Sequence, residues 1–346
     1  MAQELWSTIP WKPIADSEKT IGWHKKSVPY TENATYLQTV DIWIPPSSTP
    51  STEAPPPAAA AAVASENPSS LPTSGPWIIY IHGGAWRDPL VDSTSFSHTA
   101  ENILRSLHSS NGKSDTDSKV KIAGLASINY RLSPHPHHPT HPAPTREEGV
   151  PLDKARTALH PQHIHDILTA LSFLQKNGVT NNPYILAGHS CGATLAFQAV
   201  MDPSRWGYTL PPPTKPSIVV GLNGLYDVLS FIASPPDSHK SLVPIYEAFT
   251  IGAFGSISDS STAMPVIVAD WATEWPSAKS VVLVQSKEDK LVPYSQLEMM
   301  RARLAETGML CPVVEMEAGL DHNEMWSVGT RLAEMLMEVA AGDVGK

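Results

Sequence analysis

The chain has 346 residues, 41% of them hydrophobic and 17% charged, which is enough apolar material for a large core and excludes global disorder. The formal net charge of -10 argues against binding to nucleic acid or to an anionic membrane through bulk charge. Only two cysteines occur, Cys191 and Cys311, and no basic segment followed by an apolar run opens the chain, so we expect neither a disulfide scaffold nor a signal peptide, but a cytoplasmic protein.

Short apolar runs alternate with segments of helical spacing along most of the chain. Residues 36–44 alternate in polarity and predict a strand, and residues 77–81 form a buried apolar run that ends at glycines. Further strands are predicted at residues 122–130, 184–187, 217–222, 281–285 and 312–316. Helices are predicted at residues 96–107, 163–175, 194–201, 297–307 and 326–340. This order predicts one domain over residues 1–346, with a mostly parallel α/β sheet that helices cover on both faces.

Several segments interrupt this alternation. Residues 45–76 are rich in Pro, Ala and Ser and cannot bury enough apolar surface to offset the entropy of ordering, so we predict a disordered insertion. Residues 109–119 predict a polar loop, and residues 133–161 predict a loop rich in His and Pro. Residues 229–275 break the strand–helix rhythm, and we predict that they form a small helical cap over the carboxyl edge of the sheet.

A nucleophile elbow is predicted between the strand at 184–187 and the helix at 194–201. The sequence Gly-His-Ser-Cys-Gly at residues 188–192 has the G-x-S-x-G pattern, in which the flanking glycines permit a turn too sharp for side chains. The turn would lift the hydroxyl of Ser190 above the sheet, at the positive end of the next helix. We therefore predict Ser190 as the nucleophile, and not Cys191, because nothing near this cysteine in the sequence indicates a lowered thiol pKa.

The loop after the second predicted strand carries another motif, His-Gly-Gly-Ala-Trp, in the place of the oxyanion loop of esterases. Small residues there let backbone N–H groups approach a developing negative oxygen. We predict that the N–H groups of Gly84, Ala85 and Cys191 form the oxyanion hole. His82 is expected to hold the loop by hydrogen bonding, whereas Trp86 is either a core aromatic residue or a wall of the pocket. The motif consists of His82, Gly83, Gly84, Ala85 and Trp86.

Two segments in the last quarter of the chain supply the predicted acid and base. Asp289 follows the strand at 281–285, and His322 follows the strand at 312–316. With Ser190 they have the order nucleophile, acid, base that is typical of α/β-hydrolases. His322 would take the proton of Ser190, and Asp289 would fix the tautomer of the imidazole and stabilise its charged form.

Two other carboxylates could replace Asp289 as the acid: Glu288 beside it, and Asp227 after the strand at 217–222. We favour Asp289 because it lies shortly before a Leu-Val-Pro run at the exit of its strand. Asp321, next to the predicted base, is expected to be a solvated or structural loop residue.

A histidine cluster lies within the loop at residues 133–161. Its members sit among prolines and lack a second ligand group at fixed spacing, so a solvated loop is the better interpretation than a metal site. We therefore expect no bound metal. The histidines are His135, His137, His138 and His141.

Four motifs together resemble the kynurenine formamidases, in particular the fungal ones, of the α/β-hydrolase superfamily. They are the loop at 82–86, the elbow at 188–192, Asn-Tyr-Arg-Leu-Ser-Pro at 129–134 and Asp-His-Asn-Glu-Met-Trp at 321–326. The resemblance covers about residues 77–326. It implies an α/β-hydrolase fold and hydrolysis of the small molecule N-formyl-L-kynurenine to L-kynurenine and formate, in tryptophan degradation and de novo NAD biosynthesis. It implies neither a cofactor nor a metal.

Two other functions stay open at the level of the sequence. A carboxylesterase of the same superfamily would use the same groups on short-chain esters. A non-catalytic receptor on a hydrolase scaffold would tend to lack a member of the triad, whereas candidates for all three members are present here. The oligomeric state cannot be read from the sequence, which leaves a homodimer open.

Overall fold

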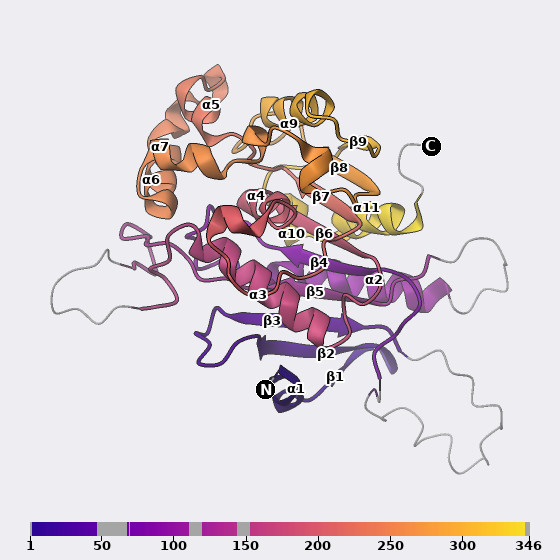
Figure 1. Cartoon of the computed structure of the whole chain (residues 1–346). Coiled ribbons are helices and arrows are strands. Elements are labelled where there is room, and N and C mark those ends of the chain that lie inside the picture. Colours follow the sequence, from indigo (N-terminus) through magenta and orange to yellow (C-terminus); the bar gives the residue numbers. More distant parts are fainter. Residues whose placement is uncertain (1, 47–67, 69, 111–119, 144–152, 343–346) are drawn as a thin grey trace, which may run out of the picture.

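One twisted sheet organises the part of the chain that the computed structural model describes, residues 2–46, 68, 70–110, 120–143 and 153–342 (Figure 1). Within those residues the sheet has nine strands, in the order β1-β2-β3-β5-β4-β6-β7-β8-β9. The pairs from β5 to β9 are parallel, whereas β1, β2, β3 and β5 pair antiparallel at the other edge. The strands are β1 (Lys12–Asp16), β2 (Lys19–Pro29), β3 (Thr39–Ile44), β4 (Trp77–Ile81), β5 (Gly124–Ile128), β6 (Tyr184–His189), β7 (Ile218–Leu222), β8 (Ser280–Gln285) and β9 (Val313–Glu317). The predicted mostly parallel sheet is confirmed.

Helices cover both faces of this sheet, as predicted. The principal ones are α2 (Ser97–Ser110), α3 (Gln162–Lys176), α4 (Cys191–Gln198), α9 (Ser295–Glu306) and α11 (Thr330–Ala341). Successive side chains of a strand point to opposite faces, and β4 shows the result. Ile79 packs into the core formed with α3, α4 and α9, whereas its neighbour Ile78 packs into the core formed with α2 and α11. The sheet therefore separates two apolar cores.

The segment between β7 and β8 is mostly helical. Figure 1 shows α5, α6 and α7 of this segment grouped at one corner of the molecule. The helices are α5 (Val228–Ala233), α6 (Val243–Phe254), α7 (Ile257–Ser260) and α8 (Trp271–Glu274), with 3₁₀ helices at Asp237–Leu242, Ser261–Ala263 and Pro265–Ile267. They occupy the span predicted as a cap.

The last predicted helix, at 326–340, is wrong as a single element. The structure has two helices there, α10 (Glu324–Ser327) and α11, separated by Gly329 with φ 75°. This left-handed backbone conformation favours glycine and ends a right-handed helix. The first predicted strand begins at Thr39 rather than at residue 36. Upstream of it, the sequence analysis assigned no element to α1 (Ala2–Thr8), β1 and β2.

Much of the predicted insertion and loops lies outside the described residues. The residues concerned are 47–67 and 69 in the first insertion, 111–119 in the polar loop and 144–152 in the loop rich in His and Pro. Those predictions stay untested. Among the helices of the described ranges, none combines the length and the apolar character that crossing a membrane requires.

Candidate active site

Ser190 lies at the turn between β6 and α4, where the elbow was predicted. Its backbone has φ 56° and ψ -122°, a conformation that L-residues rarely adopt and that is found at functional turns. A Cβ on Gly188 would lie 2.1 Å from the carbonyl oxygen of Gly192, and a Cβ on Gly192 would lie 2.3 Å from that of Ile81. Both positions therefore require glycine for steric reasons.

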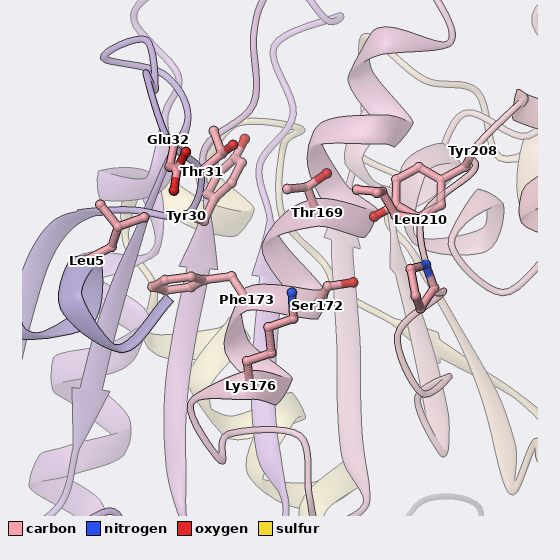
Figure 2. A pocket seen from close by; sticks show the side chains of 11 residues that line it. Leu5, Tyr30, Thr31, Glu32, Thr169, Ser172, Phe173, Lys176, Tyr208 and Leu210 are labelled. Atoms are coloured by element: carbon pink, nitrogen blue, oxygen red, sulfur yellow. The ribbon is translucent and has the colours of Figure 1, made fainter. Parts of the chain in front are cut away.

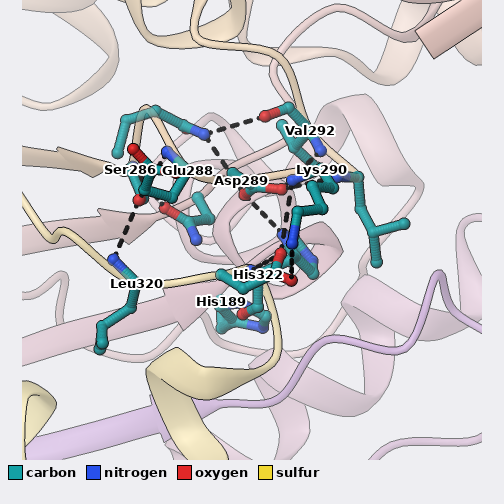
Figure 3. A network of polar contacts seen from close by, with 12 residues as sticks. His189, Ser286, Glu288, Asp289, Lys290, Val292, Leu320 and His322 are labelled. Carbon is teal, nitrogen blue, oxygen red and sulfur yellow. Dashed lines mark hydrogen bonds and ion pairs between the residues drawn. The ribbon is translucent and has the colours of Figure 1, made fainter. Parts of the chain in front are cut away.

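Asp289 and His322 contact each other directly although they follow different strands. His322 Nδ1 lies 2.7 Å from Asp289 Oδ2, and both side chains are buried (Figure 3). The other carboxylate oxygen, Oδ1, accepts the backbone N–H groups of Leu291 and Val292, each at 2.8 Å. The carboxylate is thereby held in one orientation. It favours the imidazole tautomer with the proton on Nδ1, which leaves Nε2 able to accept a proton.

Ser190 and His322 line one cavity, with a volume of about 440 Å³. This volume lies in the range of small-molecule sites. Within the described residues the structure contains no hydrogen bond between the Ser190 hydroxyl and His322. Such bonds are often long before substrate binds and tighten in the complex. The structure thus brings acid and base into contact and brings the predicted nucleophile to the same cavity.

The rival carboxylates have other surroundings. Glu288 is exposed. Asp227 is the N-cap of α5, where its side chain accepts backbone N–H groups of the first turn. Asp321 accepts the backbone N–H of His322 at 2.7 Å, a contact that orders the loop. Of the carboxylates considered from the sequence, Asp289 is the one that contacts the His322 ring within the described part of the chain.

The predicted oxyanion loop follows an unusual backbone path. Gly84, Ala85 and Trp86 have φ values of 89°, 50° and 59°, three consecutive residues in the left-handed region. The carbonyl of Gly84 accepts the N–H groups of the two residues after Trp86, at 2.9 and 2.8 Å, which closes a tight turn. Gly84 and Ala85 line the cavity with Ser190, so the loop backbone borders the predicted reaction centre.

Cys191 is buried beneath this loop. Its Sγ accepts the backbone N–H of Trp86 at 3.2 Å and lies 3.6 Å from the hydroxyl of Tyr130. Burial raises the pKa of the Cys191 thiol to about 11, although the Tyr130 hydroxyl and the N–H groups of Trp86 and Ala85 act in the opposite direction. A thiol that stays protonated is a poor nucleophile, which favours Ser190 for that role.

Trp86 is a core residue rather than a direct wall of the cavity. Its side chain is 1% exposed, and its ring centroid lies 5.1 Å from Phe254 and 6.0 Å from Phe249. Of these three aromatic residues, only Phe249 lines the cavity. Trp86 therefore packs behind Phe249, which lines the cavity. Of the two roles that the sequence left open, core residue and pocket wall, the structure shows the first.

His82 is also buried beside the loop. Its ring stacks on Tyr130 at 4.4 Å, and its Nδ1 lies 3.0 Å from the carbonyl oxygen of Gly83. Burial lowers the pKa of His82 to about 4, so the ring is neutral at pH 7. This environment agrees with the predicted structural role of His82 and not with that of a catalytic base.

His189, the variable residue of the elbow motif, is a site residue that the sequence analysis missed. It lines the cavity, and its Nε2 lies 3.1 Å from the backbone carbonyl oxygen of His322, to which it can donate (Figure 3). Burial and the neighbouring His322 hold the pKa of His189 well below its usual range, so it acts as a neutral hydrogen-bonding group. The motif tolerates many residues at this position, so no sequence signal identified it.

The remaining cavity wall combines segments that are far apart in the sequence. The segment between β7 and β8 contributes apolar side chains: Phe231, Ile245, Tyr246 and Phe249. Polar side chains that the sequence analysis did not assign to the site also line the cavity: Arg87, Asp88, His135 and Asn323. Arg87 and Asp88 directly follow the oxyanion-loop motif, which is the only local signal for them.

The histidine cluster differs from the predicted solvated loop. His138 is only 7% exposed, and its Nδ1 accepts the backbone N–H of His141 at 2.9 Å. Its neighbour His135 lines the cavity. The prediction is wrong for these two residues, because His138 anchors a turn and His135 faces the site. Within the described ranges, no group of three or more His, Cys, Asp or Glu side chains is positioned to hold a metal ion.

A second hollow, of about 270 Å³, lies between α1, the end of β2 and α3 (Figure 2). Its walls include Leu5, Tyr30, Phe173 and Lys176. Ser190, Asp289 and His322 do not line it. The proximity of Ser190 and His322 therefore makes the first cavity the candidate active site.

No family model matches the chain. Among known proteins, the chain is 34% identical over 321 residues to the kynurenine formamidase-like hydrolase fscH of Fusarium equiseti, with 90% of this chain and 92% of that protein covered. It is 32% identical over 274 residues to the kynurenine formamidase avaC of Aspergillus versicolor, covering 75% of this chain and 87% of that protein. A kynurenine formamidase of Meyerozyma guilliermondii is 32% identical over 230 residues, covering 64% and 69% of the two chains.

Solved structures of esterases share the fold. A truncated carbohydrate esterase from gut microbiota superposes with a TM-score of 0.57 at 15% identity, covering 96% of this chain and all of that chain. A hyperthermophilic esterase from the archaeon Pyrobaculum calidifontis superposes with a TM-score of 0.53 at 16% identity, covering 88% and 81% of the two chains. At this identity the likeness concerns the fold, which is that of the α/β-hydrolases.

Proposed function

We propose that this chain, which belongs to the kynurenine formamidase family of α/β-hydrolases, hydrolyses N-formyl-L-kynurenine to L-kynurenine and formate. The observation that carries the proposal is the 2.7 Å contact between His322 and Asp289 at a cavity that Ser190 also lines. Through this reaction the enzyme would serve tryptophan degradation and de novo NAD biosynthesis. Its substrate is a small molecule.

The proposed reaction begins with attack of Ser190 Oγ on the formyl carbon. His322 Nε2 takes the hydroxyl proton, and the Asp289 carboxylate stabilises the imidazolium that forms. His322 then gives this proton to the departing aniline nitrogen, which leaves a formyl ester on Ser190. Water, deprotonated by His322, attacks the ester, and His322 returns this proton to Ser190 Oγ as the ester C–O bond breaks, which releases formate and restores the hydroxyl. No group beyond these side chains and water is needed for the balance of atoms and protons.

The proposed oxyanion hole consists of the backbone N–H groups of Gly84, Ala85 and Cys191. Gly84 and Ala85 border the cavity beside Ser190, which supports the loop as the donor of these groups. Preorganised donors of this kind stabilise a developing oxyanion by about 3 kcal/mol each.

The helical segment between β7 and β8 is proposed to act as the cap. Tyr246 and Phe249 of α6 contribute apolar surface to the cavity, and Phe231 of α5 does the same. An aromatic amide would pack against such a wall. A formyl group carries only hydrogen on its carbon, so it needs little space on the acyl side of Ser190.

A carboxylesterase of the same superfamily is the second candidate function. The two solved structures described above are esterases, and the same nucleophile, acid and base would cleave a short-chain ester. The two functions differ in the leaving group and not in the catalytic groups. A direct comparison of substrates therefore distinguishes them.

The test is kcat/KM for N-formyl-L-kynurenine, p-nitrophenyl acetate and p-nitrophenyl octanoate with one enzyme preparation. We expect the formyl amide to have the highest value and the octanoate the lowest, because the proposed site has little need of acyl space. If the octanoate has the highest value, the chain is a carboxylesterase and the proposal fails. Formate should be released in a 1:1 ratio with L-kynurenine, about one molecule of each per turnover.

A further inference from the structure

Among the described residues that line the cavity, one side chain, Arg87, carries a permanent positive charge, and the proposed reaction does not use it. Arg87 lines the cavity about half-buried, together with the apolar residues of α5 and α6. Its backbone N–H donates to the carbonyl of Gly84 at 2.9 Å, so the oxyanion loop fixes the position of this residue. A half-buried guanidinium at a mostly apolar cavity loses hydration and is stabilised by an anionic partner.

The protein itself does not supply that partner within its described residues. No carboxylate lies within ion-pair distance of the Arg87 guanidinium there, although eight other Lys and Arg side chains of this part of the chain form ion pairs with carboxylates at about 4 Å or less. The adjacent carboxylate of Asp88 is engaged elsewhere. Its Oδ1 accepts the backbone N–H of Leu90 at 2.9 Å and lies 3.5 Å from His138 Nε2.

His135 lies in the same part of the cavity wall. Its Nδ1 is buried and has no hydrogen-bond partner within the described residues. Burial lowers the pKa of His135 to about 4, and the positive charge of Arg87 is the next cause, which indicates that the two side chains are close. His135 is therefore neutral at pH 7. Among the described residues, the surroundings of Arg87 thus offer a cation and a neutral hydrogen-bonding group, but no anion that forms an ion pair with Arg87.

We propose that Arg87 binds the α-carboxylate of the substrate's amino acid group and that His135 lies beside this subsite. The inference rests on the proposed function, because N-formyl-L-kynurenine carries its carboxylate at the end opposite the formyl group. A guanidinium forms paired hydrogen bonds with a carboxylate and so fixes its orientation as well as its position. Because Arg87 follows the oxyanion loop directly, one loop would hold the two ends of the substrate.

The decisive comparison uses two formyl amides that differ in the amino acid group. N-formyl-L-kynurenine carries it, and 2-formamidoacetophenone has the same reacting group without it. We expect Arg87→Gln to lower kcat/KM for N-formyl-L-kynurenine by about 30-fold or more, mostly through KM, and to change the value for 2-formamidoacetophenone by less than about 3-fold. Arg87→Lys should recover part of the loss, since it restores the charge without the paired geometry.

Arg331→Gln is the matched control, because Arg331 pairs with Glu334 on the surface of α11 and does not line the cavity. It should leave both substrates unaffected. An equal loss for both substrates in Arg87→Gln would overturn the inference and assign Arg87 a role in loop structure. Unchanged kinetics for N-formyl-L-kynurenine would also overturn it.

Binding of the product separates this inference from the proposed function. Calorimetry should detect L-kynurenine binding to the wild type and at least about 10-fold weaker binding to Arg87→Gln, with 2-aminoacetophenone binding equally to both. Absence of turnover of either formyl amide would refute the proposed function. If L-kynurenine then binds both proteins equally or neither, the carboxylate subsite is refuted as well, whereas Arg87-dependent binding would support it.

Discussion

Ser190 is held in place by its own backbone, in a left-handed turn between two glycines. His322 depends instead on other segments: the carboxylate of Asp289 orients its ring, and His189 contacts its backbone carbonyl oxygen. The position of Ser190 is therefore fixed locally, whereas the position of His322 is fixed by residues of other segments. Removing the Ser190 hydroxyl should not disturb the turn, whereas altering Asp289 should change the state of another residue.

Ser190→Ala should lower kcat by on the order of 10⁶ and leave the melting temperature nearly unchanged, because the variant loses the nucleophile but keeps the turn. Formate release and thermal denaturation measure the two effects. A serine-reactive fluorophosphonate should label the wild type and not the variant. Retention of more than a few per cent of the wild-type rate would contradict a serine mechanism.

Asp289→Asn should lower kcat by about 10⁴, because an amide favours the wrong tautomer of His322. Glu288→Gln and Asp227→Asn are the matched comparisons. The first changes an exposed side chain, and the second exchanges one N-cap for another of similar strength, because the Asn oxygen can accept the same backbone N–H groups of α5. Steady-state kinetics of the three variants should rank Asp289→Asn as the most damaging. A different ranking would remove Asp289 from the role of the acid.

At the scale of elements, the site depends on how closely α4 approaches β4 and β6. The glycines of the elbow permit this approach, since Gly192 lies against the backbone of Ile81 and Gly188 lies against Gly192. The proposed oxyanion loop that follows β4 and the proposed nucleophile that precedes α4 are thereby brought to one cavity. Close packing of backbone on backbone leaves no flexible side chain that could absorb an added methyl group.

Gly192→Ala should therefore destabilise the protein by about 1–3 kcal/mol or more and reduce activity, because its Cβ would lie 2.3 Å from the carbonyl oxygen of Ile81. Gly252→Ala, in α6, is the matched control. Its Cβ would meet only ordinary contacts, with the nearest atom at 3.5 Å, so the same change should stabilise by about 0.5–1 kcal/mol. Urea denaturation measures both changes, and effects of the same sign would contradict the packing argument.

At the scale of the whole molecule, several histidines are buried or half-buried as neutral groups. Burial lowers the pKa of His24, His82 and His160 to about 4 and the pKa of His163 to about 3. A buried carboxyl has the opposite shift, since burial raises the pKa of Asp41 to about 6. The charge state of these groups couples the free energy of unfolding to pH.

The free energy of unfolding should fall as the pH decreases from about 6.5 towards 4, by up to about 1.4 kcal/mol per pH unit for each such histidine. The sign follows because a folded-state pKa below the unfolded value makes the unfolded chain bind more protons in this window. Asp41 offsets part of the loss below pH 6, since its contribution to stability is present at low pH and is lost as the pH rises through about 6.

Urea denaturation at pH 7, 6 and 5 checks this prediction. His163→Asn should reduce the pH slope, because it removes one group that titrates only on unfolding. His137→Asn is the control, since it makes the same change at an exposed side chain. A stability that is equal or higher at pH 5 than at pH 7 would contradict the assignment of these histidines as neutral.

The features that the sequence by itself determined are local ones. The apolar run and glycines around Ser190 predicted strand, turn and helix, because alternation, helical spacing and glycine requirements act over a few residues. The same reasoning correctly predicted a mostly parallel sheet with helices on both faces. It also placed Asp289 and His322 after adjacent strands, where parallel strands bring loops to one edge.

Only the tertiary structure decided which side chains meet. His322 contacts Asp289 rather than Glu288, and His189 contacts the backbone carbonyl oxygen of His322. Arg87 and His135 line the same cavity. All of these contacts depend on the register of the strands and on how the loops at the edge of the sheet pack against one another. The break between α10 and α11 occurs at Gly329, whose positive φ the periodic spacing of apolar residues does not encode. Periodicity specifies the face of an element, whereas the position of a side chain in a cavity results from long-range packing of many elements at once.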